Sequence, residues 1–188
     1  MLLPDHYFKR SVPAAWMLGF FLTFSSPAFA VDLIPLPEPV LQVVPKLELR
    51  GASRFKKYFF HVYDARLWTV DRSDWRIDQP YALDLSYEFD FAASALADRS
   101  VVEMEQIGEA SAAERLKWRQ EMLRAFPDVK AGDRLVGLYI PGEGTRFFLN
   151  GELYSEVSDP AFAEDFFGIW LDPRTSEPDL RRDLLAQQ

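Results

Sequence analysis

The segment from Gly132 to Leu171 most constrains the fold, because three strand-like runs and one apolar helix follow one another there almost without linkers. An Asn-Gly pair at residues 150–151 separates the runs TRFFL and ELYSEV. This pair tolerates the two positive φ angles of a type I′ turn better than most residues do. The pattern therefore predicts a tight hairpin in which Leu149 faces Glu152.

Both faces of the predicted hairpin carry aromatic side chains. Its register places Phe148 beside Leu153 on one face of the sheet. On the other face, Phe147 lies beside Tyr154. The preceding run, residues 134–140, is also apolar on both sides. Such runs are typical of strands in the middle of a sheet, so we expect this segment to lie there.

An apolar helix is predicted directly after the hairpin. Asp159 can cap its N-terminus, and Pro160 fits its first turn, where a missing N–H costs nothing. Residues 161–171 are apolar almost all round, which is typical of a buried helix. Its aromatic side chains could belong to a packed core or to the wall of an apolar cavity; they are Phe162, Phe166, Phe167 and Trp170.

The N-terminus is typical of a secretory signal peptide, predicted over residues 1–30. A short basic region with Lys9 and Arg10 precedes an apolar run over residues 14–24, and a small-x-small cleavage site ends at Ala30. A retained membrane anchor is the less favoured interpretation, because the apolar run is short for a bilayer span. Cleavage after Ala30 leaves 158 of the 188 residues, enough for one full core.

The composition excludes several classes of function. The formal net charge is −8, and removal of residues 1–30 changes it to −9, so the chain is a poor candidate for binding nucleic acid. There is no cysteine, and His61 is the one histidine beyond the predicted signal peptide, which rules out thiolate chemistry and a multi-histidine metal site. No phosphate-binding or dinucleotide-binding glycine motif is present, and we expect no cofactor.

The exported chain is expected to begin with an arm followed by strands. Residues 31–45 contain four prolines in an apolar stretch, which favours an extended arm over a helix. Strand-like alternation follows over residues 46–50, 57–70 and 81–89, with a break at residues 51–53. The last of these runs alternates most cleanly, so one of its faces is expected to see water.

Three further helices are predicted. An apolar stripe at helical spacing runs from Ala93 to Ile107, and Gly108 is expected to end that helix. Ser111 and Glu114 form a capping box for the second helix, and residues 176–179 repeat the capping pattern for a short third one. The side chains expected inward on the second helix are Leu116, Leu123 and Phe126, and those expected to face solvent on the first are Arg99, Glu103 and Glu105.

The order of these elements predicts an α+β fold. Two helices stand in one block between antiparallel strands, instead of alternating with single strands as they do in parallel β-α-β units. The simplest arrangement is one antiparallel sheet with helices packed against one face. No internal repeat is visible, so residues 46–188 are expected to form one domain behind the arm.

Arg50 and Tyr63 are the residues best suited to hold a ligand. An arginine and a phenol that approach one cavity could bind a carboxylate or an enolate-like oxygen, because the guanidinium is permanently charged and offers parallel donors. A surface arginine and a core tyrosine are the alternative interpretation of the same residues. No pair of carboxylates is placed for acid–base catalysis, since Glu103 and Glu105 point in different directions on a helix.

Several motifs, taken in order, give the chain a family resemblance. They are R-G-x-x-R from Arg50, V-Y-x-A-x-L-W from Val62, F-P-D-V-x-x-G-D-R-L-x-G-L-Y from Phe126, F-F-x-N-G from Phe147 and F-F-G-I-W-L from Phe166. In this order and spacing the chain resembles the chalcone isomerase-like superfamily, and in particular its exported bacterial branch. The resemblance extends from about Leu47 to Leu185.

The resemblance implies an open-faced β-sandwich, in which a large antiparallel sheet is covered by a helical layer with a ligand cleft between them. Some members of the superfamily are isomerases that close a flavanone ring. Others bind fatty acids through an arginine and a tyrosine, and a third group acts without catalysis. Arg50 and Tyr63 match the arginine and the tyrosine of the fatty-acid-binding members.

The chain departs from the pattern of the isomerases. Their strand threonine falls on Val62, which has no hydroxyl, and residues 91–108 contain none of the tyrosine, lysine and asparagine that their helix contributes. Without these groups, the donors that stabilise the reacting ketone are missing. The departures argue against flavanone formation.

We therefore hypothesise a non-catalytic periplasmic protein that binds a fatty acid or a similar amphipathic carboxylate, with no metal, cofactor, nucleic acid or stable membrane span. Two alternatives stay open. One is an intramolecular lyase (isomerase) acting on another substrate, with Arg50 as its catalytic residue; the other is an interaction module whose pocket is filled by its own side chains. The expected ligand contacts are Arg50 and Tyr63 for the head group and Phe147, Phe162, Phe166 and Trp170 for the tail.

Overall fold

The computed structural model describes residues 31, 34–108 and 110–187, and the signal peptide predicted over residues 1–30 lies outside this part of the chain. The described residues form six strands and five helices. The strands are β1 (Glu48–Lys57), β2 (Phe60–Thr69), β3 (Tyr81–Tyr87), β4 (Arg134–Ile140), β5 (Gly144–Leu149) and β6 (Glu152–Val157). The helices are α1 (Glu38–Val43), α2 (Ala93–Ile107), α3 (Ala112–Ala125), α4 (Pro160–Leu171) and α5 (Pro178–Leu184).

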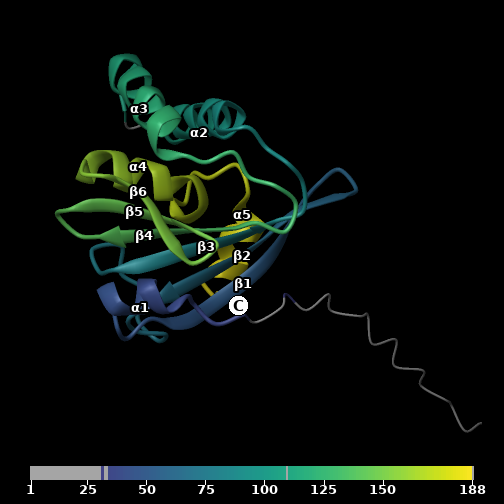
Figure 1. The fold of residues 1–188 in the computed structure, drawn as a ribbon, viewed down its shortest axis with the longest axis vertical. Helices are drawn as coiled ribbons and strands as arrows, with labels where there is room; N and C mark the ends of the chain where they lie inside the picture. Colours follow the sequence, from purple (N-terminus) through teal and green to yellow (C-terminus); the bar gives the residue numbers. More distant parts are fainter. Residues whose placement is uncertain (1–30, 32–33, 109, 188) are drawn as a thin grey trace, which may run out of the picture.

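The strands form one antiparallel sheet, and their order in the sheet is their order in the sequence. Helices α2, α3 and α4 lie on one side of the sheet and α1 on the other (Figure 1). The predicted α+β architecture, an open sheet under a helical layer, is confirmed. None of the described helices is long and apolar enough to cross a bilayer.

The β5–β6 hairpin forms around the Asn-Gly turn, whose residues take φ angles of 51° and 93°. Leu149 pairs with Glu152 as predicted. The expectation that Phe147 lies beside Tyr154 is wrong, because the register shifts after the first pairs of the hairpin and Phe147 pairs with Ser155. The turn therefore sets the register of the pairs next to it, and an irregularity between Phe147 and Phe148 shifts the register of the later pairs.

Strands β1 and β2 differ from their predicted bounds. The expected break at residues 51–53 is wrong, since β1 continues through Gly51 with only a register irregularity. A Cβ at Gly51 would lie 2.3 Å from the Asp183 carbonyl oxygen, so glycine here permits the close approach of the α5 backbone. Strand β2 begins at Phe60, because the chain turns at Tyr58, which has a φ of 56°.

The outer face of the sheet is covered by the N-terminal arm, which was expected to be extended. Residues 38–43 of the arm form α1 instead, with Pro39 in the first helical turn, where proline is tolerated. Val40 of α1 is fully buried. This cover also buries both faces of β3, so the expectation that one face sees water is wrong. The buried residues of this outer cluster are Leu36, Val40, Leu47, Ala82, Val136, Leu138 and Phe148.

Helix α2 ends and helix α3 begins at the residues predicted from the sequence. Gly108 ends α2 with a φ of 82°. The Ser111 hydroxyl accepts from the Glu114 amide at 3.3 Å, and the Glu114 carboxylate accepts from the Ser111 amide at 2.8 Å, which completes the capping box. Leu116, which was expected inward, is 62% exposed, because α3 turns a different face with Trp118 toward the core.

The ends of α4 and α5 differ in how they are capped. The Asp159 carboxylate accepts from the Phe162 amide at 3.2 Å and caps α4 as predicted. The capping pattern predicted from Ser176 is wrong, since Glu177 occupies the N-cap of α5 without a side-chain hydrogen bond. The Ser176 hydroxyl instead donates to the Glu103 carboxylate at 2.7 Å.

A buried ion pair links the central strands on the outer face. Asp84 of β3 has no exposed surface, and the Arg134 guanidinium of β4 donates to its two oxygens at 2.8 and 2.6 Å. Arg66 of β2 approaches the same carboxylate at 3.8 Å. Arg134 also donates to the Pro35 carbonyl at 2.9 Å. Asp84 and the two arginines therefore join three strands, and Arg134 also holds the arm.

We expect Asp84→Ala to destabilise the fold by about 3–5 kcal/mol, because it leaves the buried Arg66 and the largely buried Arg134 without their carboxylate. Asp78 is a matched control, since Arg76 binds it through the same two-point geometry at 3.0 and 2.7 Å on the surface. Asp78→Ala should change little. Urea unfolding of both variants measures the difference, and equal effects would contradict the prediction.

Candidate functional site

A cavity of about 310 Å³ lies between the inner face of the sheet and the helical layer. Its floor comes from β1 to β5, and its roof comes from α2 and α4. Most of the lining side chains are aromatic or aliphatic. Cavities that hold small molecules measure about 300–1,000 Å³, so this one suits a small or slender ligand.

The floor of the cavity follows from the period of two in the strands, which turns alternate side chains toward the helices. Tyr63, Leu85 and Phe147 reach the cavity from three different strands. Gly137 of β4 also lines it, and a Cβ there would lie 3.2 Å from the Phe167 ring. The absence of a side chain at Gly137 leaves space for that ring.

The roof is a wall of aromatic rings from α4. The rings of Phe166 and Phe147 meet edge to face with centroids 5.6 Å apart, and those of Phe166 and Trp170 do so at 5.4 Å. Edge-to-face contacts of this kind are favourable and hold the rings in fixed orientations. From α2, Leu96 adds an aliphatic contact to the lining.

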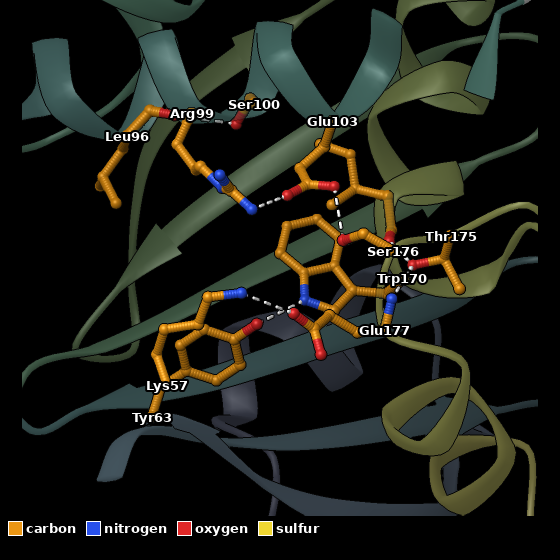
Figure 2. Close-up of polar contacts among 11 residues, drawn as sticks. Lys57, Tyr63, Leu96, Arg99, Ser100, Glu103, Trp170, Thr175, Ser176 and Glu177 are labelled. Carbon is orange, nitrogen blue, oxygen red and sulfur yellow. Dashed lines mark hydrogen bonds and ion pairs between the residues drawn. The ribbon is translucent and has the colours of Figure 1, made fainter. Parts of the chain in front are cut away.

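Polar side chains gather at one side of the cavity (Figure 2). Arg99 and Glu103 of α2 form an ion pair, and Glu103 also accepts from Ser176 at 2.7 Å. The Arg99 side chain is 59% exposed, whereas that of Glu103 is 9% exposed. Lys57, at the end of β1, binds Glu177 at 3.3 Å. Each carboxylate at this mouth therefore has a cation beside it.

Tyr63 offers an available hydrogen-bond donor beside these groups. Its hydroxyl oxygen accepts from the Trp170 indole N–H at 3.0 Å, and within the described residues its own O–H has no acceptor. Desolvation raises the pKa of Tyr63 well above the usual value for tyrosine, although the hydrogen bond from Trp170 acts in the opposite direction. The phenol therefore stays protonated and can donate to a ligand oxygen.

Four of the six predicted ligand contacts line the cavity, namely Tyr63, Phe147, Phe166 and Trp170. Phe162 is fully buried in the core beside the cavity, and its ring stacks on Phe166 with centroids 5.4 Å apart. It supports the aromatic wall from behind and does not form part of the lining.

Arg50 lies away from the cavity. Its guanidinium donates to the Leu185 carbonyl at 3.1 Å and to the Arg72 carbonyl at 2.8 Å. Tyr63 pairs with Phe55, five residues further along β1 than Arg50, which corresponds to roughly 17 Å of strand. The geometry thus does not bring Arg50 and Tyr63 together, and Arg50 holds α5 and the β2–β3 loop.

Arg99 and Glu103 are the site residues that the sequence interpretation placed in solvent. Glu103 is 7% exposed, so the expectation of a solvated face is wrong for this residue. The signal that could have found them is their spacing, because Leu96, Arg99, Ser100 and Glu103 recur at three and four residues on one helix face. Among the described residues, no cluster of three or more histidines and carboxylates could hold a metal ion.

With its sheet, its helical layer and the cavity between them, the chain is an α+β protein with a candidate site under the helices. The chain belongs to the chalcone isomerase-like family, because the model of that family matches residues 28–186. This match covers the strands, the helical layer and all the residues that line the cavity.

Two known proteins are similar to this chain. An uncharacterized protein of Haemophilus influenzae is 28% identical over 128 residues, which are 68% of this chain and 62% of the relative, so the chain spans less than two thirds of that protein. The crystal structure of a fatty-acid binding protein from Arabidopsis thaliana matches with a TM-score of 0.56 and 11% identity, over 74% of this chain and 87% of that one. At this identity the likeness shows the fold alone.

Proposed function

We propose that the protein is a non-catalytic binding protein for a fatty acid or a similar amphipathic carboxylate. The observation that carries this proposal is an apolar cavity of about 310 Å³ with its polar side chains gathered at one side. An acyl chain that enters it gains about 25 cal/mol for each Å² of apolar surface removed from water. The fatty-acid binding protein that shares the fold supports the same class of ligand.

The carboxylate head group would be held by Tyr63 and Arg99. The Tyr63 O–H is protonated and has no acceptor in the described part of the chain. Arg99 carries the charge that was expected from Arg50, and its exposed position lets it meet a head group at the mouth. A charged donor and a neutral donor on one carboxylate form a common recognition pattern.

The absence of catalysis is part of the proposal. Val62 lines the cavity without a hydroxyl, and the polar residues that α2 contributes are Arg99, Ser100 and Glu103. These do not replace the tyrosine, lysine and asparagine that would polarise a reacting ketone. Steady turnover of a chalcone by the purified protein would contradict this part.

Export to the periplasm, as in the exported bacterial branch of the family, is also proposed. It rests on the basic region, apolar run and cleavage site of residues 1–30. A mature protein that begins at Val31 in a periplasmic extract supports it, and a full-length chain in the cytoplasm contradicts it.

We expect Leu85→Trp to fill the cavity and remove bound lipid. Leu85 lines the cavity, so the larger ring has space and stability should change by less than about 1 kcal/mol. Leu67 is the matched control, because it is fully buried in the same core but does not line the cavity. Leu67→Trp should cost about 1–3 kcal/mol and keep the ligand.

Denaturing extraction followed by mass spectrometry measures the lipid that each variant carries, and thermal unfolding measures stability. A wild-type protein that carries no fatty acid and binds none in titration would refute the proposed ligand. Equal lipid content in wild type and Leu85→Trp would show that the ligand binds elsewhere.

We expect Arg99→Gln to weaken laurate binding by about three- to fivefold, because an exposed arginine adds only a modest charged contact. Arg50→Gln should leave the affinity unchanged, since Arg50 lies away from the cavity and its hydrogen bonds among the described residues go to backbone carbonyls. Affinity should not fall as the pH rises from 8 to the usual tyrosine pKa of 10.0, because desolvation keeps Tyr63 protonated there. Calorimetric titration measures the affinity of both variants and its dependence on pH. A loss of affinity confined to Arg50→Gln would assign the head-group contact to Arg50 instead of Arg99.

A further inference from the structure

Three aromatic residues stand exposed at the turn between β1 and β2. Tyr58 is 87% exposed, Phe59 is 99% exposed and Phe60 is 63% exposed. They follow one another in the sequence, and the hairpin that carries them projects from the body of the protein (Figure 1). We call these three residues the aromatic tip.

Neither turn geometry nor solubility explains the aromatic tip. Tyr58 has a φ of 56°, a conformation that favours glycine or asparagine in tight hairpin turns. Large aromatic side chains in water also forgo the favourable free energy of burial. Contiguous exposed apolar residues mark sites of interaction, so the tip is expected to meet an apolar partner.

The shape of the tip favours a fluid partner over a protein surface. Phe59 at 99% exposure has almost no neighbour on any side, so the tip is convex and offers neither a groove nor a flat face. A lipid bilayer can close around such a projection. Lys56 and Lys57 lie exposed at its base and place positive charge there, although Lys57 also pairs with Glu177, and aromatic rings favour the membrane interface.

We propose that the aromatic tip docks this protein on a lipid bilayer, with its rings inserted at the level of the head groups. Phe89 enlarges the inserted surface, since it is 43% exposed and its ring lies 6.2 Å from that of Phe60. Binding of this kind scales with the apolar area buried in the interface. Docking itself does not depend on what fills the cavity.

The tip is connected to the mouth of the cavity. Phe55 and Val62, which flank it in the sequence, both line the cavity. Lys57 at its base binds Glu177, which also lines the cavity. A docked tip therefore holds the mouth beside the bilayer, where an amphipathic ligand resides.

Phe59→Ser tests the proposal, because a side chain that is 99% exposed can be removed without loss of folded contacts. In flotation assays with phosphatidylcholine vesicles, we expect the wild type to bind and Phe59→Ser to bind about tenfold more weakly. Leu116→Ser is the matched control, since Leu116 is 62% exposed on α3, and it should bind as the wild type does. Circular dichroism and thermal unfolding confirm that all three proteins are folded.

Three results would overturn the proposal. The first is a wild type that does not float with the vesicles, and the second is an equal loss of binding in both serine variants. The third is a dimer seen by sedimentation without vesicles that Phe59→Ser abolishes while vesicle binding is unchanged. That result would assign the aromatic tip to contact between two copies of the chain.

Discussion

The buried ion pair between Asp84 and Arg134 is the interaction on which the sheet depends. A carboxylate without exposed surface in a central strand is strongly unfavourable unless it is paired. Its arginine also holds the carbonyl of Pro35, so the pair fastens the arm across the outer face. With that face closed by α1, the inner face is the one that can carry a site under helices.

Structural features that depend on residues close together in the sequence could be predicted from it. The Asn-Gly turn, the capping box of Ser111 and the cap of Asp159 form local hydrogen bonds, and the mostly apolar α4 was expected to be buried. Contacts between segments that are far apart in the sequence could not be predicted from it. Alternation separates the two faces of a strand, but it does not show which positions along the strand lie under the helices, and this is why Arg50 was expected beside Tyr63. Arg99 shares a helix face with Leu96 and Glu103, but this spacing alone does not show that the face meets a cavity.

Aromatic packing explains how a rigid core and a cavity exist side by side. The rings of Phe147, Phe166 and Trp170 meet edge to face and cannot fold into a gap as a methionine can. Phe162 stacks behind them and Gly137 leaves space in front of Phe167. The same residues that predict a buried helix therefore also maintain the empty volume.

For the fatty-acid ligand proposed above, the contacts from Arg99 through Glu103 to Ser176 have a consequence for discrimination by hydrocarbon length. An anionic head group must compete with Glu103 for the guanidinium, so the head contributes little net affinity. Acetate and other short acids then gain almost nothing, whereas each methylene that enters the cavity adds about 0.8 kcal/mol. Under that proposal, the affinity of the site would rise with the length of the acyl chain, up to the volume that the rings enclose.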